Sequence, residues 1–447
     1  MSIDNVIQDW LKNRNITEVE GLVPDMSGTA RGKIVPAAKF CKEEGLRLPE
    51  SVFIQTVTGE YPDDDSVIHP AEIDILAHPD PGTIRIVPWA AEPTAQVIHD
   101  CYYRDGRPVE ISPRYVLRRV LSLYEQQGWE PVVAPELEFY LVKINADPDY
   151  PLVPPVGRSG RPETVRQSYS IDAVNEFDPL FEDIYRYCEA QDLDIDTLIH
   201  EAGAAQLEFN FLHGKALDLA DQTFLFKRTV RETALRHQMY ATFMAKPLEH
   251  EPGSAMHIHQ SVVDIETRRN IFIDEQGRYS RLFLSHIAGL QKYLPMAMSF
   301  FAPNVNSYRR IARDKAAPIN THWGPDNRTA GFRVPDSDPQ ATRVENRVPG
   351  ADANPYLALA VSLACGYLGM MEELDPTPPL EVSAYDFPFD LPRSIHESLR
   401  LLADCKPLHK TLGARFVAAY SAVKEKEYEA FFHVISSWER EYLLLNV

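Results

Sequence analysis

Alternating polar and apolar positions predict a strand at residues 132–142. The segment is otherwise apolar but contains Glu136 and Glu138. Because strand side chains point to opposite faces with a period of two, the two glutamates share one face, and Leu137 and Phe139 share the other. Two carboxylates side by side on a buried strand repel each other and lose their water. The pattern indicates a cation or a bound proton between them, unless this is an edge strand with both glutamates in solvent.

Three later segments also carry a face of ligating or charged side chains. These polar faces are Gln206, Glu208 and Asn210 in residues 206–211, His257, His259 and Ser261 in residues 256–261, and Arg343, Glu345 and Arg347 in residues 343–347. The first segment has a clearly apolar opposite face. If helices back all four strands in one sheet, these faces line a deep polar cleft.

The chain before residue 108 is predicted to be rich in short strands. The spacing of Val6, Ile7, Trp10 and Leu11 predicts an opening helix. The strand-like runs that follow are separated by turns of proline, glycine and aspartate. They lie at residues 18–23, 33–37, 52–56, 83–87 and 95–103. This part is therefore expected to form a small β-rich domain.

Longer helices and strands alternate after residue 108. Ser112 and Pro113 have the residue types of a helix N-cap and first helical position. Further helices are predicted from residue 178, at 221–239, 282–301 and 354–371, and beyond about residue 393, with strands at 205–212, 254–263 and 342–348. The second part is therefore predicted to be a larger mixed domain.

Composition narrows the class of protein. The 447 residues suffice for two or three domains, and 44% apolar with 25% charged residues is ordinary for a soluble enzyme. The net charge of -20 argues against nucleic-acid binding, which needs a basic face. Five dispersed cysteines predict reduced thiols, and the apolar run 356–371 is shorter than the roughly 20 residues of a membrane span. We expect a cytoplasmic protein with no membrane or nucleic-acid partner.

Each polar motif has a common alternative explanation when taken alone. His257 and His259 could be ordinary polar residues, and residues 343–347 could be a solvated edge of alternating charge. Together the motifs favour a metal site, since glutamates with one or two histidines suit Mg²⁺ or Mn²⁺. Arginines on the same surface suit carboxylates or phosphates, as phosphoryl transfer from a nucleotide requires. The sequence lacks a glycine-rich phosphate loop, so metals and arginines would hold ATP.

The order of the motifs resembles that of the glutamine synthetases. The resemblance runs from Arg31-Gly32-Lys33 to Asn354-Pro355-Tyr356 and covers most of the chain. The matching motifs in between are residues 136–138, Glu201 with 205–208, 253–261, 306–310, 327–329 with Arg333, and 343–347. The resemblance implies an α+β fold. Residues 1–107 would form a small β-grasp-like domain, and residues 108–447 a catalytic domain with a curved antiparallel sheet backed by helices.

The resemblance also implies roles for individual residues. One metal would be bound by Glu138, Glu201 and Glu208, and a second by Glu136, His257 and Glu345. Glutamate or the transferred phosphoryl group would be held by Arg310 and Arg347, with Gly253 nearby. ATP would lie along His259, Ser261, Arg333 and Arg343, with Arg328 at its terminal phosphate. The resemblance implies that the catalytic residues are Arg310, Arg328, Glu345 and Arg347.

Family members also assemble into stacked rings, usually dodecamers of two hexamers. Each active site lies between one subunit's catalytic domain and its neighbour's N-terminal domain. The resemblance therefore implies a homo-oligomer that takes glutamate, a nitrogen nucleophile and ATP, with two or more Mg²⁺ or Mn²⁺ ions per site.

Departures from the family pattern concern the nucleophile. Residues 53–60 lack the aspartate motif that binds ammonium in ammonia-using members, and Ala316 stands where those members have an acid. Pro252 replaces an asparagine that often precedes the glycine. Residues 304–308 and 323–329 look like the branch that makes γ-glutamylamines. We therefore expect ligation of glutamate to a primary amine such as putrescine, spermidine or spermine. The alternatives are an ammonia-using glutamine synthetase and a non-catalytic ring-forming homologue.

Overall fold

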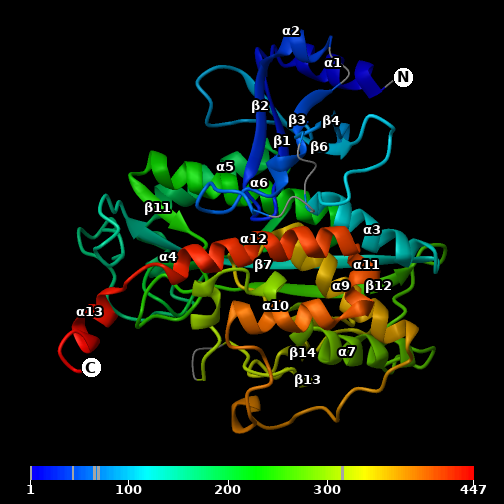
Figure 1. Ribbon diagram of the computed structural model, residues 1–447, viewed down its shortest axis with the longest axis vertical. Coiled ribbons are helices and arrows are strands. Elements are labelled where there is room, and N and C mark those ends of the chain that lie inside the picture. The colour runs from blue at the N-terminus through cyan, green and yellow to red at the C-terminus, as the bar shows by residue number, and fades with distance from the viewer. Residues whose placement is uncertain (1–2, 43–44, 64–66, 68–70, 314–316) are drawn as a thin grey trace.

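The computed structural model describes residues 3–42, 45–63, 67, 71–313 and 317–447. A smaller sheet lies at one end of the molecule, and a larger curved sheet backed by helices forms the rest (Figure 1). The expected α+β fold is confirmed. The smaller sheet uses residues 18–102 and the larger one residues 129–346, while the domain division between residues 107 and 108 stays a prediction.

The smaller sheet is mostly antiparallel. Its strands in spatial order are β2 (Ala30–Pro36), β1 (Glu18–Pro24), β6 (Thr94–Tyr102), β4 (Asp74–Pro79) and β3 (Leu46–Pro49), and β5 (Arg85–Ile86) also pairs with β6. Only the β1–β6 pair among them is parallel. Strands β3 and β4 were not expected from the sequence.

The expected strand at residues 52–56 is wrong. Glu50–Phe53 form a 3-10 helix, closed by the Ile54 N–H on the Ser51 carbonyl. Phe53 and Ile54 are nonetheless buried. A short apolar run does not distinguish a strand from a buried helical turn, which explains the error.

The larger sheet is arranged around its longest strand, β7 (Trp129–Lys143). The spatial order is β13 (Trp323–Pro325), β14 (Phe332–Val334), β15 (Val344–Asn346), β12 (Met256–Asp264), β7, β9 (Gln206–Phe211) and β8 (Ile195–His200), with β10 (Gly214–Lys215) and β11 (Met239–Thr242) also paired to β7. Apart from β13–β14, these pairs are antiparallel. The strands expected around Glu136, Glu208, His257 and Glu345 are therefore neighbours.

Helices cover the apolar face of this sheet. Helix α9 (Pro355–Met371) lies in the core against α3 (Pro113–Glu125), α6 (Ala216–Arg236) and α7 (Arg281–Tyr293). It begins as predicted, because the Asn354 side chain accepts the N–H groups of Tyr356 and Leu357. Among the residues that the structure describes, no helix has the length and apolar character needed to cross a membrane.

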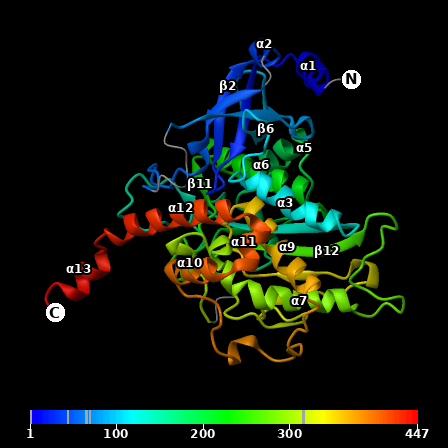
Figure 2. The same ribbon diagram turned by 45° about the vertical axis from the view of Figure 1, so that its right-hand side comes forward.

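Two expected helices have different bounds. Helix α6 begins at Ala216 rather than residue 221. The helix expected over residues 282–301 is interrupted after Tyr293, because Pro295 opens a 3-10 turn that ends at Ala297. The other α-helices are α1 (Ile3–Asn13), α2 (Ala37–Phe40), α4 (Ile171–Asn175), α5 (Asp178–Ala190), α8 (Met298–Phe301), α10 (Ile395–Asp404), α11 (Lys406–Leu412), α12 (Ala414–Phe432) and α13 (Ser437–Leu443). Helix α13 projects away from the body (Figure 2).

A buried arginine joins the two sheets. Arg114 of α3 donates to Asp221 of α6 at 2.7 and 2.9 Å, to Asp80 at 2.7 Å and to Asp100 at 2.6 Å. Asp80 follows β4 and Asp100 lies in β6, so both belong to the smaller sheet. Arg114 is only 1% exposed. One desolvated guanidinium thus ties the smaller sheet to the helices behind the larger one.

Replacing Arg114 with methionine should lower the free energy of unfolding by about 3–5 kcal/mol, because the buried Asp221 loses the guanidinium it pairs with, whereas Asp80 and Asp100 keep Arg118. The midpoint of urea unfolding measures this loss. Arg107→Met is the matched control, because Arg107 pairs with Asp105 at the exposed surface and should leave the midpoint unchanged. Equal midpoints for wild type and Arg114→Met would contradict this role for Arg114.

Candidate active site

The strand register brings the predicted carboxylates together. Glu136 of β7 lies opposite His257 of β12, and Glu138 lies opposite Glu208 of β9. Directly opposed residues share one face of a sheet, with Cβ atoms about 4.5–5.5 Å apart. Glu345 of β15 lies one strand farther on, opposite His259. The polar faces expected from the sequence thus meet on a single surface of the larger sheet.

Two groups of these side chains have the spacing of metal ligands. Glu136, His257 and Glu345 form one group, and Glu138, Glu208 and His257 form the other, with donor atoms within 4.8 Å of one another in each. His257 belongs to both groups. Glu201 lines the same cavity but joins neither group within the described residues. The earlier division of six ligands between two metals therefore stays a prediction.

A cavity of about 530 Å³ is lined by acidic and by basic side chains. The carboxylates and the imidazole in its wall are those of Glu136, Glu138, Glu201, Glu208 and His257. The wall also includes Gly253 and the side chains of Arg310, Arg328, Arg333 and Arg347. Ten predicted site residues thus meet around one cavity, although they come from distant parts of the chain.

The expected nucleotide residues divide between two cavities. His259, Ser261 and Arg343 line a second cavity of about 780 Å³. Glu136 and Asn210 line both cavities, so the two adjoin. Arg328 and Arg333 lie on the carboxylate side. ATP lying along all five predicted residues would therefore extend from one cavity into the other.

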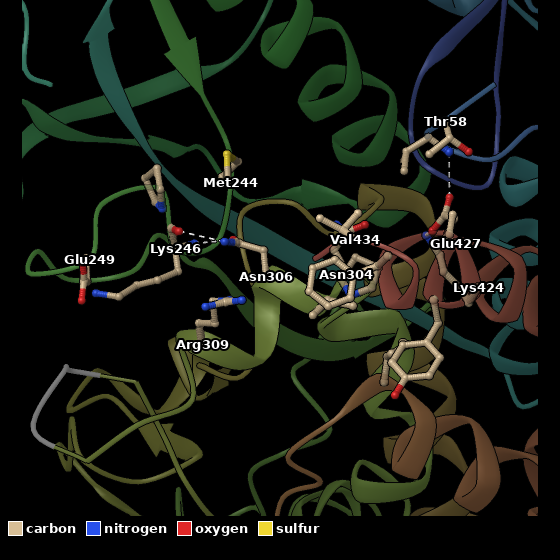
Figure 3. A pocket seen from close by; sticks show the side chains of 18 residues that line it. Thr58, Met244, Lys246, Glu249, Asn304, Asn306, Arg309, Lys424, Glu427 and Val434 are labelled. Carbon is tan, nitrogen blue, oxygen red and sulfur yellow. Dashed lines mark hydrogen bonds and ion pairs between the residues drawn. The ribbon is translucent and has the colours of Figure 1, made fainter. Parts of the chain in front are cut away.

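A third cavity, of about 860 Å³, contains none of the predicted site residues. Figure 3 shows it between Thr58, Met244, Arg309 and Glu427. Asn306 closes one side, since its side chain exchanges two hydrogen bonds of 2.9 Å with the Lys246 backbone. Size alone therefore does not identify the chemical site.

If all of them were ionised, the buried carboxylates would carry more negative charge than their surroundings neutralise. Burial, with the nearby charge of Glu201, raises the pKa of Glu138 to about 8. Burial and four neighbouring glutamates raise the pKa of Glu208 well above its usual range. Such a set of oxygen donors with one imidazole fits a hard divalent cation, which would let these carboxyls ionise together.

Two other carboxylates already have cationic or hydrogen-bonding partners. Burial opposes ionisation of Glu136, but hydrogen bonds from His257 and His259 outweigh it and lower the pKa of Glu136. Burial also opposes ionisation of Glu345, but the Arg347 guanidinium leads the charges that lower its pKa to about 2. Arg333 donates to Glu345 at 2.8 Å. These two glutamates are therefore ionised at neutral pH.

His259, which lines the second cavity, has a defined tautomer when its ring is neutral. The Arg343 Nε–H donates to His259 Nδ1 at 3.1 Å. Because Nδ1 must then accept, the proton of a neutral ring lies on Nε2, which donates to Glu136 at 2.9 Å. A single hydrogen-bonded chain thus links an expected nucleotide residue to an expected metal ligand.

Arg310 is fixed by backbone groups, not by carboxylates. It donates to the carbonyls of Val348 at 2.8 Å and Arg347 at 3.0 Å. Gly253 packs against it so closely that an added Cβ would lie 2.6 Å from Arg310 Cγ. Burial lowers the pKa of Arg310 to about 10, which leaves it charged at neutral pH. Its positive charge remains available to an anionic ligand.

Two aromatic residues in the cavity wall were not expected from the sequence. Tyr169 and Tyr385 line the carboxylate cavity, as does Ala317. Both tyrosines lie outside the strands, in segments without a periodic pattern. The nearby Ala316, expected to replace an acid, lies outside the described residues. A tyrosine in an irregular segment carries no periodic signal that could have revealed it.

Comparison with known proteins identifies the family. Residues 110–443 match the sequence model of "Glutamine synthetase, catalytic domain". The chain belongs to the glutamine synthetase family. It is accordingly an ATP-dependent carbon–nitrogen ligase, in a family that uses divalent metals.

Relatives whose names indicate different nitrogen substrates resemble this chain along most of its length. Gamma-glutamylputrescine synthetase of Escherichia coli is 36% identical over 97% of this chain and 92% of its own. Glutamate–isopropylamine ligase of a Pseudomonas species is 30% identical over 97% and 96%. Glutamine synthetase of Thermus thermophilus is 31% identical over 89% and 91%. The solved structure of GmaS without ligand aligns with a TM-score of 0.84 at 27% identity, covering 98% of this chain and 99% of that one.

Binding of Mn²⁺ at pH 7 should release protons. With a pKa of about 8, Glu138 is mostly protonated at pH 7 in the metal-free protein, whereas a metal ligand must be ionised. Raising the pH toward 8 removes that proton beforehand, so affinity should rise and proton release should fall. Calorimetry in two buffers of different ionisation enthalpy measures both quantities.

The matched variants are Glu208→Ala, in the carboxylate cluster, and Glu189→Ala, on the exposed side of α5. We expect the first to weaken Mn²⁺ binding strongly and the second to leave it unchanged. Tight binding by Glu208→Ala, or binding by wild type without proton release, would contradict the proposed metal cluster.

Proposed function

We propose that the protein joins the γ-carboxylate of glutamate to a primary amine, most favourably a polyamine such as putrescine, spermidine or spermine. ATP is converted to ADP and phosphate. The observation that carries the proposal is that the carboxylate cluster lines the same cavity as Arg310 and Arg347. This arrangement suits a carboxylate substrate next to a metal-bound phosphate chain.

The chemistry requires activation of glutamate. Its γ-carboxylate is a poor acyl donor, because the leaving group would be oxide. Transfer of the terminal phosphoryl group of ATP gives γ-glutamyl phosphate, from which phosphate leaves readily. Mg²⁺ or Mn²⁺ held by Glu136, Glu138, Glu201, Glu208, His257 and Glu345 would neutralise phosphate charge.

The arginines have separate roles in this proposal. Arg310 and Arg347 bind the glutamate carboxylates and later the phosphoryl oxygens. Arg328 neutralises charge on the group in transfer. His259, Ser261, Arg333 and Arg343 orient the nucleotide along the two adjoining cavities. Within the part of the chain that the structure describes, the buried Nε atoms of Arg333 and Arg347 have no hydrogen-bond partner, which supports a ligand at these arginines.

Several observations support an amine as the nucleophile. The relatives that resemble this chain along nearly its whole length include two whose names specify an amine. Tyr169, Ala317 and Tyr385 give part of the cavity wall aromatic and aliphatic surface. An alkylammonium packs well on such a surface, whereas ammonium depends on acidic partners. A primary amine of pKa about 10.4 must lose a proton before it attacks.

The proposal includes a ring-shaped homo-oligomer, a dodecamer of two stacked hexamers, with each site completed by a neighbour's N-terminal domain. Large apolar side chains at the C-terminal end are exposed in the single chain and support assembly. They include Phe432, Ile435, Trp438, Leu444 and Leu445. Light scattering of the purified protein tests the assembly directly.

An amine panel tests the substrate. We expect kcat/KM to be at least about tenfold higher for a diamine or polyamine than for ammonium, with rates rising toward alkaline pH as the amine loses its proton. A coupled assay of ADP release, run with glutamate and each nucleophile in turn, measures both kcat/KM and the dependence of the rate on pH.

Variants at position 316 separate charge from size. Ala316→Glu should impair amine use and improve ammonium use relative to Ala316→Gln, which has similar bulk but no charge. If wild type makes glutamine from ammonium faster than it ligates every amine in the panel, the ammonia-using alternative is correct. If glutamate-dependent ATP cleavage is absent with every nucleophile, the protein is a non-catalytic homologue.

A further inference from the structure

The segment between β7 and α5 carries Tyr169 to the carboxylate cavity. This segment is irregular apart from an isolated bridge and the short helix α4. Tyr169 has a positive φ of 61°, a conformation that costs energy for a residue with a side chain. Its backbone N–H donates to the His200 carbonyl at 2.8 Å. The position of Tyr169 therefore depends on what holds the segment next to His200.

His200 is itself held by Glu163 of the same segment. The His200 Nε2 lies 3.0 Å from Glu163 Oε2, and its Nδ1 lies 2.7 Å from the Glu201 carbonyl oxygen. Glu163 Oε2 also accepts the Ala205 N–H at 2.7 Å. The His200 side chain is fully buried and that of Glu163 is 8% exposed. A carboxylate in the segment is thus anchored to both ends of the turn that carries Glu201.

The geometry of these contacts holds the His200 ring at both nitrogens. The Glu201 carbonyl oxygen can only accept, so His200 Nδ1 donates to it, while Nε2 meets the Glu163 carboxylate. Because the side chains of the pair are buried and Glu163 also binds the Ala205 N–H, these contacts are shielded from competing water. The Glu163–His200 pair can therefore hold Tyr169 in its strained conformation.

We propose that Glu163 and His200 form a latch that holds Tyr169 at the cavity, making Glu163 a positioning residue for the nitrogen nucleophile. Glu163 does not line the cavity, whereas Tyr169 and Glu201 do. The latch therefore acts on the nucleophile indirectly, through Tyr169 and Glu201. This inference rests on the proposed function only in naming an amine as that nucleophile.

A second contact holds the segment from its outer side. Arg166 donates to Glu251 at 3.3 Å and to the His250 carbonyl. Glu251 lies close in sequence to Gly253, which packs on Arg310. Because Arg166 is largely exposed and Glu163 is buried, the latch has the greater influence on the inner end of the segment.

The variant Glu163→Gln tests the latch. An amide oxygen is a weaker hydrogen-bond acceptor than a carboxylate oxygen, so the contacts to His200 and to the Ala205 N–H should weaken and Tyr169 should lose its fixed position. We expect KM for the nucleophile to rise about tenfold, as for loss of a hydrogen bond to a charged group, while KM for ATP changes by less than about twofold. Trypsin should also cleave faster after Arg166 in this variant.

Glu176→Gln is the matched control on the same segment. Glu176 accepts the Ser159 N–H at 3.0 Å instead of binding His200, and it does not line the cavity. The Glu176→Gln variant should leave the KM values for nucleophile and ATP unchanged, even if trypsin cleaves it faster after Arg158. If Glu163→Gln does not fold, Glu163→Asp, which retains the charge on a shorter side chain, is measured in its place and should show a smaller rise in nucleophile KM.

Two results would overturn the latch. One is an unchanged nucleophile KM in the folded Glu163 variant. The other is an equal rise in the KM values for nucleophile and ATP, as general loosening of the site would produce. The nucleophile used is whichever one wild type prefers. A preference for ammonium would refute the proposed amine substrate, yet the same comparison made with ammonium would still decide whether the latch exists.

Discussion

Desolvated negative charge on the central strand is the constraint on which the rest of the site depends. Glu138 and Glu208 face each other across β7 and β9, and burial raises the pKa of both. Burying carboxylates without counter-charge is costly, so the fold must provide cations or accept them from solution. The glutamine synthetase family uses divalent metals, and metals bound here would supply the missing positive charge.

The surrounding fold keeps these charges in place. Leu137 and Phe139, on the opposite face of β7, are fully buried. A shift in register by one residue would exchange these two side chains with the glutamates and bury charge in the core. Arg114 fixes the smaller sheet to the same helices. The two sheets and their helices thus position the carboxylates and arginines of the site, whereas Tyr169 reaches the cavity from an irregular segment and, in our proposal, needs a separate anchor.

The periodicity of the sequence correctly predicted which polar side chains share one face of a strand. Alternation placed Glu136 beside Glu138 and His257 beside His259, and the register of β7 with β12 joins the two pairs. It could not predict the 3-10 helix at Phe53, because a short apolar run fits a strand equally well. It also could not reveal Tyr169, whose position depends on a hydrogen bond to a residue distant in sequence. The family resemblance, not periodicity, supplied Glu201, Arg310 and Arg328.

Oxygen transfer from glutamate tests the central claim most directly. Glutamate carrying ¹⁸O in its γ-carboxylate is incubated with ATP and the preferred amine, and the inorganic phosphate is analysed by mass spectrometry. If the carboxylate is activated as γ-glutamyl phosphate, one ¹⁸O atom passes into phosphate for each amide formed. Amide formation with unlabelled phosphate would contradict the account, since ATP would then be cleaved without phosphorylating the glutamate carboxylate.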